Sequence, residues 1–261
     1  MAPKPQAGIQ SVEVGFALLS TLADARAPMM LRDLAVAAGM SAAKAHRYLV
    51  SFQRLELVVQ DERNTRYDLG PAALKLGLAS LERLDAVQLA RARMDALMTE
   101  VGQTLAIAVW GNHGPTIVHW QEPPQAVTVN LRLGDVMPLL TSATGRCFAA
   151  HAQPQAIAAM LKTELAILQK APRGDAPTTA AAVQALFSEV RERGLGRVCD
   201  TLLPGIAGFC APVFDASGHM ALGLVSLGSS ASFDTAWQGV VANALRRCAQ
   251  QLSRDLGAKL A

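Results

Sequence analysis

The sequence has 261 residues, of which 51% are hydrophobic, and its formal net charge is +3 at pH 7. This length allows one or two domains with a sizeable core, and the hydrophobic content excludes an intrinsically disordered chain. The small net charge and the lack of a polybasic tail exclude general coating of nucleic acid, so any DNA contact must be local.

The N-terminus has no apolar segment of signal-peptide length, and no run approaches the roughly 18 apolar residues of a membrane span. We therefore expect a cytoplasmic protein without membrane contact. The four cysteines, Cys147, Cys199, Cys210 and Cys248, show neither CxxC spacing nor histidines at zinc-ligand offsets. This pattern favours structural thiols, and we expect neither a metal site nor a cofactor.

The first predicted helix begins after residue 10. Ser11 can cap it, and Val12, Phe16, Leu19 and Leu22 share one face, which we expect to form part of a small core.

Two short helical patterns then meet at a glycine. The apolar residues of one helical face in the first pattern are Leu31, Leu34, Ala35 and Ala38. Gly39 can adopt the positive φ that ends this helix, and Ser41 can cap the next one. The spacing predicts a helix-turn-helix with a steep angle between its helices.

The second helix of the pair, over residues 41–55, has an apolar stripe and a small, basic opposite face. The stripe consists of Ala45, Leu49, Phe52 and Leu55. The outward face holds Ala42, Ala43, His46, Arg47, Val50 and Arg54. Residues 57–60 and 66–69 then flank the turn 61–65, which predicts a β-ribbon wing after a recognition helix.

Gly70-Pro71 marks a domain boundary, and Pro71 suits the first turn of a further helix. Leu74, Leu78 and Leu81 recur on one face of that helix with little local core to cover them. We therefore expect residues 71–84 to form a linker helix that contributes to a homodimer contact, between a DNA-binding domain over residues 1–70 and a second domain over residues 85–261.

The second domain alternates helical and strand patterns. We expect a helix with Val87, Ala90, Met94, Leu97 and Val101 on one face. Strands are expected at 104–110, 116–120, 127–133, 209–214 and 219–227. Helices are expected from about Thr141 to Lys170, after a cap at Thr179, and at the C-terminus, where Trp237, Val241, Leu245, Cys248 and Leu252 form the buried stripe and Asp234 is a cap. This order predicts an α+β domain with a mainly antiparallel sheet flanked by helices.

Several segments spread over nearly the whole chain together resemble the IclR family of bacterial transcriptional regulators. They are Ser11-Val12-Glu13, Leu34-Ala35, Gly39-Met40-Ser41, Ala45-His46-Arg47-Tyr48-Leu49, Tyr67-Asp68-Leu69-Gly70-Pro71, Thr144-Gly145-Arg146 and Ala211-Pro212-Val213-Phe214-Asp215. The resemblance implies an N-terminal winged helix-turn-helix, a dimerising linker helix and a C-terminal GAF-like domain that binds a small effector, commonly an organic acid. It also implies a homodimer or a dimer of dimers that binds double-stranded operator DNA.

The sequence departs from the family pattern in both functional regions. Ala43-Lys44 stands where the family often has Ser-Thr, which replaces hydroxyls with a methyl group and a charge. Some members hold a carboxylate with an Asp, a Cys and two Ser residues. By resemblance, the corresponding positions here are Val198, Gly208, Val225 and Leu227, so a drier pocket is expected.

The candidate DNA-binding residues lie on the recognition helix and the wing: Ser41, Ala42, Ala43, Lys44, His46, Arg47, Arg54, Arg63 and Arg66. Arg47 and Lys44 can reach bases or phosphates, and arginines on a wing are natural phosphate or minor-groove contacts. The alternative for each is an ordinary solvated charge, and His46 could instead bond neighbouring backbone groups.

The candidate effector-binding residues are Trp110, Leu139, Thr141, Ser142, Ala143, Thr144, Asp200, Gly208, Val225 and Leu227. The hydroxyl-rich segment 141–144 precedes a helix, where free N–H groups and the helix dipole favour an anion. Ordinary capping is the alternative for these hydroxyls, core packing for Trp110 and a surface turn for Asp200. Because the other positions are apolar, an aromatic or largely apolar carboxylic acid fits better than glyoxylate or pyruvate.

An enzyme is disfavoured. The sequence has no GxSxG elbow, no motif that pairs a histidine with a cysteine or serine, no GxGxxG after a strand and no P-loop. No catalytic residue is therefore assigned. A DNA-binding scaffold without an effector is the other alternative, and a DNA-tethered enzyme is a more remote one.

Overall fold

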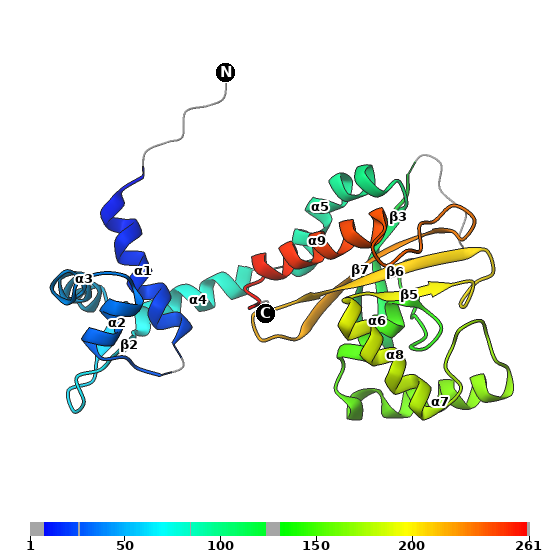
Figure 1. Ribbon diagram of the computed structural model, residues 1–261, viewed down its shortest axis with the longest axis horizontal. Coiled ribbons are helices and arrows are strands. Elements are labelled where there is room, and N and C mark those ends of the chain that lie inside the picture. The colour runs from blue at the N-terminus through cyan, green and yellow to red at the C-terminus, as the bar shows by residue number, and fades with distance from the viewer. Residues whose placement is uncertain (1–7, 26, 84, 124–130, 260–261) are drawn as a thin grey trace, which may run out of the picture. The chain divides into compact units, whose positions relative to one another are not determined.

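The computed structural model describes residues 8–25, 27–83, 85–123 and 131–259. The chain divides into two compact units, Met1–Leu84 and Asp85–Ala261. Each unit is described by itself below (Figure 1).

The N-terminal unit is a three-helix core followed by a two-stranded wing and a further helix. Its elements are α1 (Gln10–Asp24), α2 (Leu31–Ala37), α3 (Ala42–Arg54), β1 (Val58–Gln60), β2 (Tyr67–Leu69) and α4 (Pro71–Arg83). β1 and β2 pair antiparallel, with Val59 opposite Asp68. The predicted winged helix-turn-helix is confirmed.

The turn between α2 and α3 forms as its residues dictate. Gly39 has φ +68°, and the hydroxyl of Ser41 accepts a hydrogen bond from the backbone N–H of Lys44 at 3.4 Å. The unit's core is built from all three helices and both strands. Its buried members are Leu18, Leu22, Leu34, Ala35, Ala45, Leu49, Val58 and Tyr67.

The predicted buried face of α1 is only half correct. Leu22 is buried and Leu19 packs against the core as expected, but Val12 and Phe16 are each 64% exposed, and Gly15 and Leu18 are buried instead. A Cβ on Gly15 would lie 3.0 Å from the rings of Tyr48 and Phe52, so the glycine side of α1 is the one that can approach α3 closely.

Two finer expectations for this unit were also wrong. Ser11 does not cap α1, because the helix begins at Gln10, with Ile9 at the N-cap position and no side-chain cap. Leu55 is exposed, because it follows the last residue of α3 and leaves the apolar stripe there.

Helix α4 starts at Pro71, as expected. Leu74 is 64% exposed and Leu76 is 66% exposed, so this part of α4 presents leucines that its own unit does not bury. The side chains of Leu78 and Leu81 lie outside the described residues.

The C-terminal unit contains an antiparallel sheet of five strands in the order β4-β3-β7-β6-β5. The strands are β3 (Thr104–Gly111), β4 (Gly114–Gln121), β5 (Gly196–Cys199), β6 (Ile206–Phe214) and β7 (Met220–Ser229). The helices are α5 (Ala86–Val101), α6 (Ala143–His151), α7 (Pro154–Lys170), α8 (Ala180–Arg193) and α9 (Val240–Asp255). The predicted α+β class with an antiparallel sheet is confirmed.

The helices cover the two faces of the sheet in separate layers. α5 and α9 pack on one face and against each other, while α6 packs on the other face, with α8 behind it and α7 farther out (Figure 1). This arrangement leaves the N-terminal end of α6 facing strands β5, β6 and β7.

The predicted continuous helix from Thr141 to Lys170 is two helices. α6 ends at His151, and α7 begins with Pro154 in its first turn, because proline cannot donate the N–H that a continuous helix needs. The four-residue strand β5 was not predicted. The strand expected at 127–133 lies largely outside the described residues, and 131–133 form no strand.

The C-terminal stripe is partly as predicted. Val241, Leu245 and Leu252 are buried in α9, but Cys248 is half-buried and Trp237 lies in the loop before the helix. The Asp234 carboxylate accepts the backbone N–H of Val240 at 3.0 Å and so supports the start of α9, although Gly239 occupies the N-cap position.

Among the described residues, no helix has both the length and the apolarity that crossing a membrane requires.

Candidate functional site

The recognition helix α3 presents its predicted contact residues to solvent. Ser41, Ala42, Ala43, Lys44, His46, Arg47 and Arg54 are all exposed, while Ala45 and Leu49 hold the helix on the core. The N-terminal half of α3 therefore offers small side chains beside two cations, which is the form of surface that enters a major groove.

A polar cleft of about 660 Å³ runs along this half of α3. It is lined by Ser11, Ser41, Ala43, Lys44, Arg47, Tyr48 and Ser51. Ser11, Tyr48 and Ser51 were not assigned to this surface from the sequence. Ser11 belongs to α1, and its place beside α3 is a tertiary contact that no local pattern reveals. Hydroxyls and a lysine at such a place suit a phosphate oxygen.

The wing is organised by Asp61. Its carboxylate accepts the backbone N–H of Arg63 at 2.8 Å and the side-chain amide of Asn64 at 2.7 Å. The Arg66 guanidinium donates to the Pro28 carbonyl at 2.9 Å, so it is partly committed to the fold. The Arg63 side chain has no hydrogen bond or ion pair within the described part of the chain and extends from an exposed turn.

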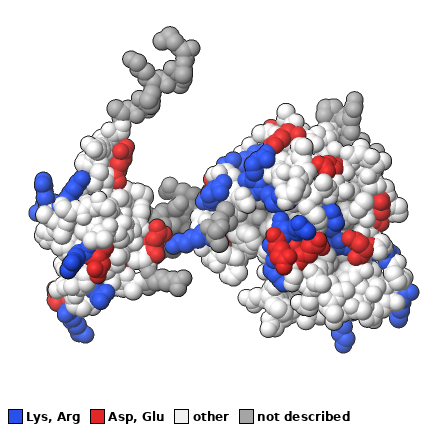
Figure 2. Space-filling view, viewed as in Figure 1, with Lys and Arg blue, Asp and Glu red and all other residues white. Residues whose placement is uncertain are grey.

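Acidic and basic side chains are interspersed over the visible face of both units (Figure 2). This distribution agrees with the small net charge and favours a local DNA contact over a broad basic surface.

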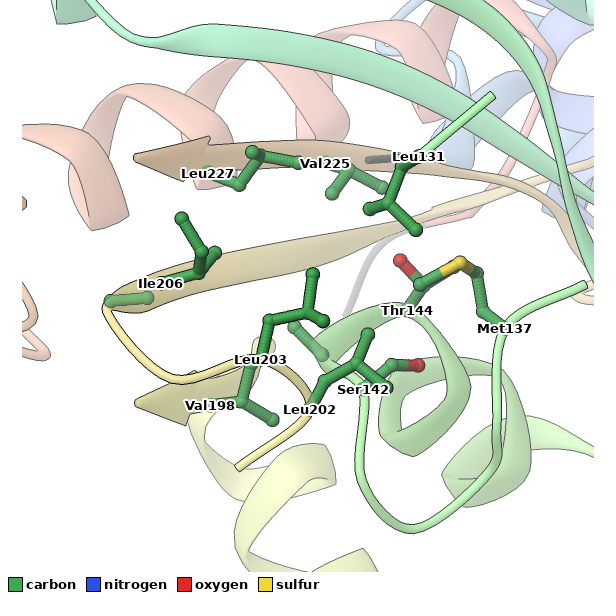
Figure 3. Close-up of a pocket in the computed structure, with 13 residues that line it drawn as sticks. Leu131, Met137, Ser142, Thr144, Val198, Leu202, Leu203, Ile206, Val225 and Leu227 are labelled. Atoms are coloured by element: carbon green, nitrogen blue, oxygen red, sulfur yellow. The ribbon is translucent and has the colours of Figure 1, made fainter. Parts of the chain in front are cut away.

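A cavity of about 40 Å³ lies between the start of α6 and the sheet in the C-terminal unit, and we call it the effector cavity. It is lined by Leu131, Met137, Ser142, Ala143, Thr144, Val198, Leu202, Leu203, Ile206, Ala207, Gly208, Val225 and Leu227. Among the labelled side chains in Figure 3, oxygen atoms occur only on Ser142 and Thr144.

The polar side of the effector cavity is the N-terminus of α6. The Ser142 hydroxyl has no free proton to offer a ligand, because it donates to the Pro138 carbonyl at 2.7 Å, and it accepts the N–H of Gly145 at 2.8 Å. The backbone N–H groups of Ala143 and Thr144 donate no hydrogen bond within the described residues. These free donors and the helix dipole can stabilise an anion.

Gly145 allows this helix start to form. A Cβ at residue 145 would lie 1.8 Å from the Pro138 carbonyl oxygen, so only glycine lets the preceding segment cross over the helix. Arg146 ties the segment before α6 to β5, because its guanidinium donates to the carbonyl of Leu140 at 2.9 Å and to the carbonyl of Arg197 at 2.7 Å.

Four predicted effector residues do not line the cavity. Trp110 is 40% exposed and its ring is tilted against Phe148, and Leu139 is buried between α7 and α8 with the core there. Thr141 lines a different cleft, beside α7. Asp200 shapes the loop before β6.

Asp200 acts through that loop. Its carboxylate accepts the Ser230 hydroxyl at 2.9 Å and the Gly205 N–H at 2.6 Å, and these bonds lower the pKa of Asp200. The loop carries Leu202 and Leu203 into the cavity wall. Leu131, Met137, Leu202 and Leu203 lie outside helices and strands, where no periodicity marks them, and Ile206 is the first residue of β6, so no sequence pattern indicated these cavity residues.

No group of three or more His, Cys, Asp or Glu side chains in the described part of the chain is arranged to hold a metal ion.

Comparison with known proteins assigns the family. Residues 78–254 match the family described as bacterial transcriptional regulator IclR C-terminal, and residues 11–62 match the IclR helix-turn-helix domain. The chain therefore belongs to the IclR family of bacterial DNA-binding transcriptional regulators.

Two relatives match it over nearly their full length. The glycerol operon regulatory protein of Streptomyces griseus is 31% identical over 253 residues, covering 96% of this chain and 97% of the relative. The crystal structure of Pseudomonas aeruginosa HmgR is 36% identical with a TM-score of 0.85, covering 97% of this chain and 100% of that one.

An IclR homologue from Microbacterium hydrocarbonoxydans, solved in complex with 4-hydroxybenzoate, shares the fold. It is 18% identical with a TM-score of 0.53, and the match covers 94% of this chain and 98% of that one.

Proposed function

We propose that this regulator controls a catabolic operon and that its operator affinity responds to an aromatic or otherwise largely apolar carboxylic acid in the effector cavity. One observation carries the proposal: Ala143 and Thr144, whose backbone N–H groups have no hydrogen-bond partner within the described residues, line a cavity whose other walls are almost entirely apolar. The relatives described above, which include a glycerol operon regulator and a homologue solved with 4-hydroxybenzoate, support it.

The carboxylate would accept hydrogen bonds from the N–H groups of Ala143 and Thr144 and from the Thr144 hydroxyl. The body of the acid would pack on Val225 and Leu227. A two-carbon or three-carbon keto acid would leave its remaining oxygens unpaired against these walls, at a cost of about 1 to 3 kcal/mol for each group. The cavity chemistry therefore favours the apolar acid.

Binding requires the cavity to expand. A volume of about 40 Å³ is far below the roughly 300 Å³ of a small-molecule pocket. Leu131, Leu202 and Leu203 lie on loops, so they are the wall residues that can move with the least disturbance of the sheet. A wall that moves on binding gives the ligand a way to favour one state of the protein over another, with a coupling of about 1 to 3 kcal/mol.

The remaining assignments are part of the same proposal. DNA is contacted by the exposed face of α3 and by the wing, chiefly through Arg47, Lys44 and Arg63. Residues 1–70 form the DNA-binding domain, 71–84 the linker and 85–261 the effector domain. The exposed leucines of α4 support a homodimer, which can assemble further into a dimer of dimers, and the regulator acts in the cytoplasm, where bacterial operator DNA lies.

Calorimetry with two groups of acids tests the effector. Benzoate and 4-hydroxybenzoate should bind, with operator release measured in parallel, while glyoxylate and pyruvate should not. Thr144→Val keeps the shape of the side chain and removes its hydroxyl, so it should weaken binding. Thr163→Val, on the exposed side of α7, is the matched control. Tight binding of the keto acids alone would overturn this reading of the cavity.

A second candidate function is a DNA-binding scaffold without an effector. The small enclosed volume of about 40 Å³ favours it. Operator binding that no acid in either group alters, together with no calorimetric signal, would select this candidate over the first.

A further inference from the structure

A second cleft lies in the C-terminal unit, on the other side of the segment that precedes α6. Its volume is about 410 Å³, within the range of small-molecule sites. Its apolar walls come from Val136, Met137 and Pro138 on that segment and from Met160, Ile167 and Leu168 on α7. We call it the α7 cleft.

A hydroxyl without a protein partner belongs to a residue that lines this cleft. Thr141 is only 7% exposed, and its hydroxyl makes no hydrogen bond within the described residues. Its oxygen is not closed off inside the protein, so the hydroxyl is available to a ligand oxygen or an ordered water in the cleft.

Two basic side chains border the same space. Arg173 and His113 both line the cleft and are exposed, and neither forms an ion pair within the described part of the chain. An arginine fork and an imidazole N–H are donors that match a carboxylate.

The acidic side chain that lines the cleft is already committed. The two carboxylate oxygens of Glu164 accept the backbone N–H groups of Leu139 at 2.7 Å and Leu140 at 2.9 Å. Burial raises the pKa of Glu164 in spite of these bonds, so this carboxyl group ionises less readily than an exposed glutamate. The donors in the cleft therefore outnumber the free acceptors.

We propose that the α7 cleft binds a small organic carboxylate with an apolar body, held by Arg173, His113 and the Thr141 hydroxyl. The apolar body lies against Met160 and Ile167. This site is separate from the effector cavity, and its occupation does not depend on the function proposed above.

The cleft is placed to act on the effector cavity. Met137 lines both spaces, and Glu164 ties α7 to the segment between them. A ligand that moves α7 or Met137 therefore changes the affinity of the effector cavity for its own ligand. This regulatory role rests on the proposed function, whereas binding in the cleft does not.

The test uses the full chain with ¹³C-labelled methionine methyl groups and the probe 1-naphthoate. Met160 lines the α7 cleft but not the effector cavity, so its methyl resonance, assigned with Met160→Leu, should shift on addition of the probe. Calorimetry should show that Arg173→Gln weakens binding by about threefold or more, while Arg91→Gln, at an exposed arginine outside the cleft, has no effect.

One uncharged and one cationic analogue test the ligand class. Uncharged 1-naphthalenemethanol and cationic 1-naphthylmethylamine should both bind more weakly than 1-naphthoate. Tighter binding of the amine would mean that Glu164 rather than Arg173 selects the ligand, and this result would overturn the proposal.

Leu227→Phe separates the two sites because it narrows only the effector cavity. The Met160 shift should persist in this variant. A probe that binds without shifting the Met160 methyl group, or that does not bind at all, overturns the proposal. If the acids fail to act through the effector cavity while the Met160 shift remains, the proposed effector function falls and the α7 cleft stands.

Discussion

Arg146 and Asp175 form a bidentate ion pair in which the arginine is buried and the carboxylate is at the surface. Nη1 donates to Oδ2 at 3.0 Å and Nη2 donates to Oδ1 at 2.7 Å. The Arg146 side chain is 1% exposed, whereas that of Asp175 is 57% exposed. Asp175 also accepts the Thr201 hydroxyl at 2.6 Å, so this carboxylate links α6 to the loop that carries Leu202 into the effector cavity.

Asp175→Asn should destabilise the protein by about 1 to 3 kcal/mol, because it leaves the buried guanidinium without its counter-charge. Urea unfolding measures this loss. Glu100→Gln, which removes the partner of Arg247 in an exposed ion pair, is the matched control and should cost less than about 1 kcal/mol. Equal losses in the two variants would contradict the special role of the buried arginine.

The same pair predicts a pH dependence. Burial alone would raise the pKa of Asp175, but the hydrogen bonds and charge of Arg146 outweigh it and lower the pKa. A lowered pKa in the folded state gives stability that is present above the unfolded pKa of about 3.9 and is lost as the pH falls through the folded value. The difference in unfolding free energy between the wild type and Asp175→Asn should therefore shrink below about pH 4.

Arg47→Ala should weaken operator binding by about 1 to 3 kcal/mol and relax base preference at one position of each half-site, if the guanidinium pairs with a guanine. Half-sites should be related by a near-palindrome and lie about one helical turn, or a multiple of it, apart. Footprinting over a set of operator variants measures both effects, with Arg91→Ala in the other unit as the control. Wild-type affinity and preference in Arg47→Ala would remove this residue from the interface.

The two wing arginines should behave differently. Arg63→Ala should weaken binding to all sequences alike and reduce the slope of log K against log salt by about one, because an exposed wing cation neutralises a phosphate. Arg66→Ala should lower the stability of the N-terminal unit as well, since Arg66 donates to the Pro28 carbonyl. Salt titrations and thermal unfolding of both variants distinguish these outcomes.

Leu74→Asp should shift the protein toward monomer and weaken operator binding, while the unfolding free energy of each unit stays nearly unchanged, because the side chain is 64% exposed in its own chain. Sedimentation at micromolar concentration measures the change. Lys75→Asp, which places an aspartate at the neighbouring exposed position, is the matched control for Leu74→Asp. A dimer that resists Leu74→Asp would show that α4 does not form the contact.

The sequence predicted the elements whose signals are local. Gly39 and Ser41 determine the α2–α3 turn by their own backbone and capping chemistry, and the short, nearly continuous apolar runs of β3, β6 and β7 indicate strands without reference to the rest of the chain. These features need no knowledge of tertiary contacts.

What the sequence could not supply depends on partners distant in the chain. Val12 and Phe16 look as suitable for a core as Leu18, and only the close approach of Gly15 to α3 decides which side is buried. Likewise, Thr141 and Thr144 are only three residues apart near the start of α6, yet Thr141 lines the α7 cleft and Thr144 lines the effector cavity. The two residues are separated in this way because the segment at Pro138 crosses over α6 in close contact with Gly145.

The order of strands in the sheet also determines when each unit can form during synthesis. β3 pairs with β7, so that Thr104 lies opposite Leu227. The sheet therefore cannot be completed until the ribosome has synthesised β7, which is more than half of the way from β3 to the end of the sequence. The winged unit needs no residue after α4. Because domains fold as units and the N-terminal one emerges first, the winged unit can complete its fold on the ribosome before β7 has been synthesised and the sheet of the C-terminal unit can form.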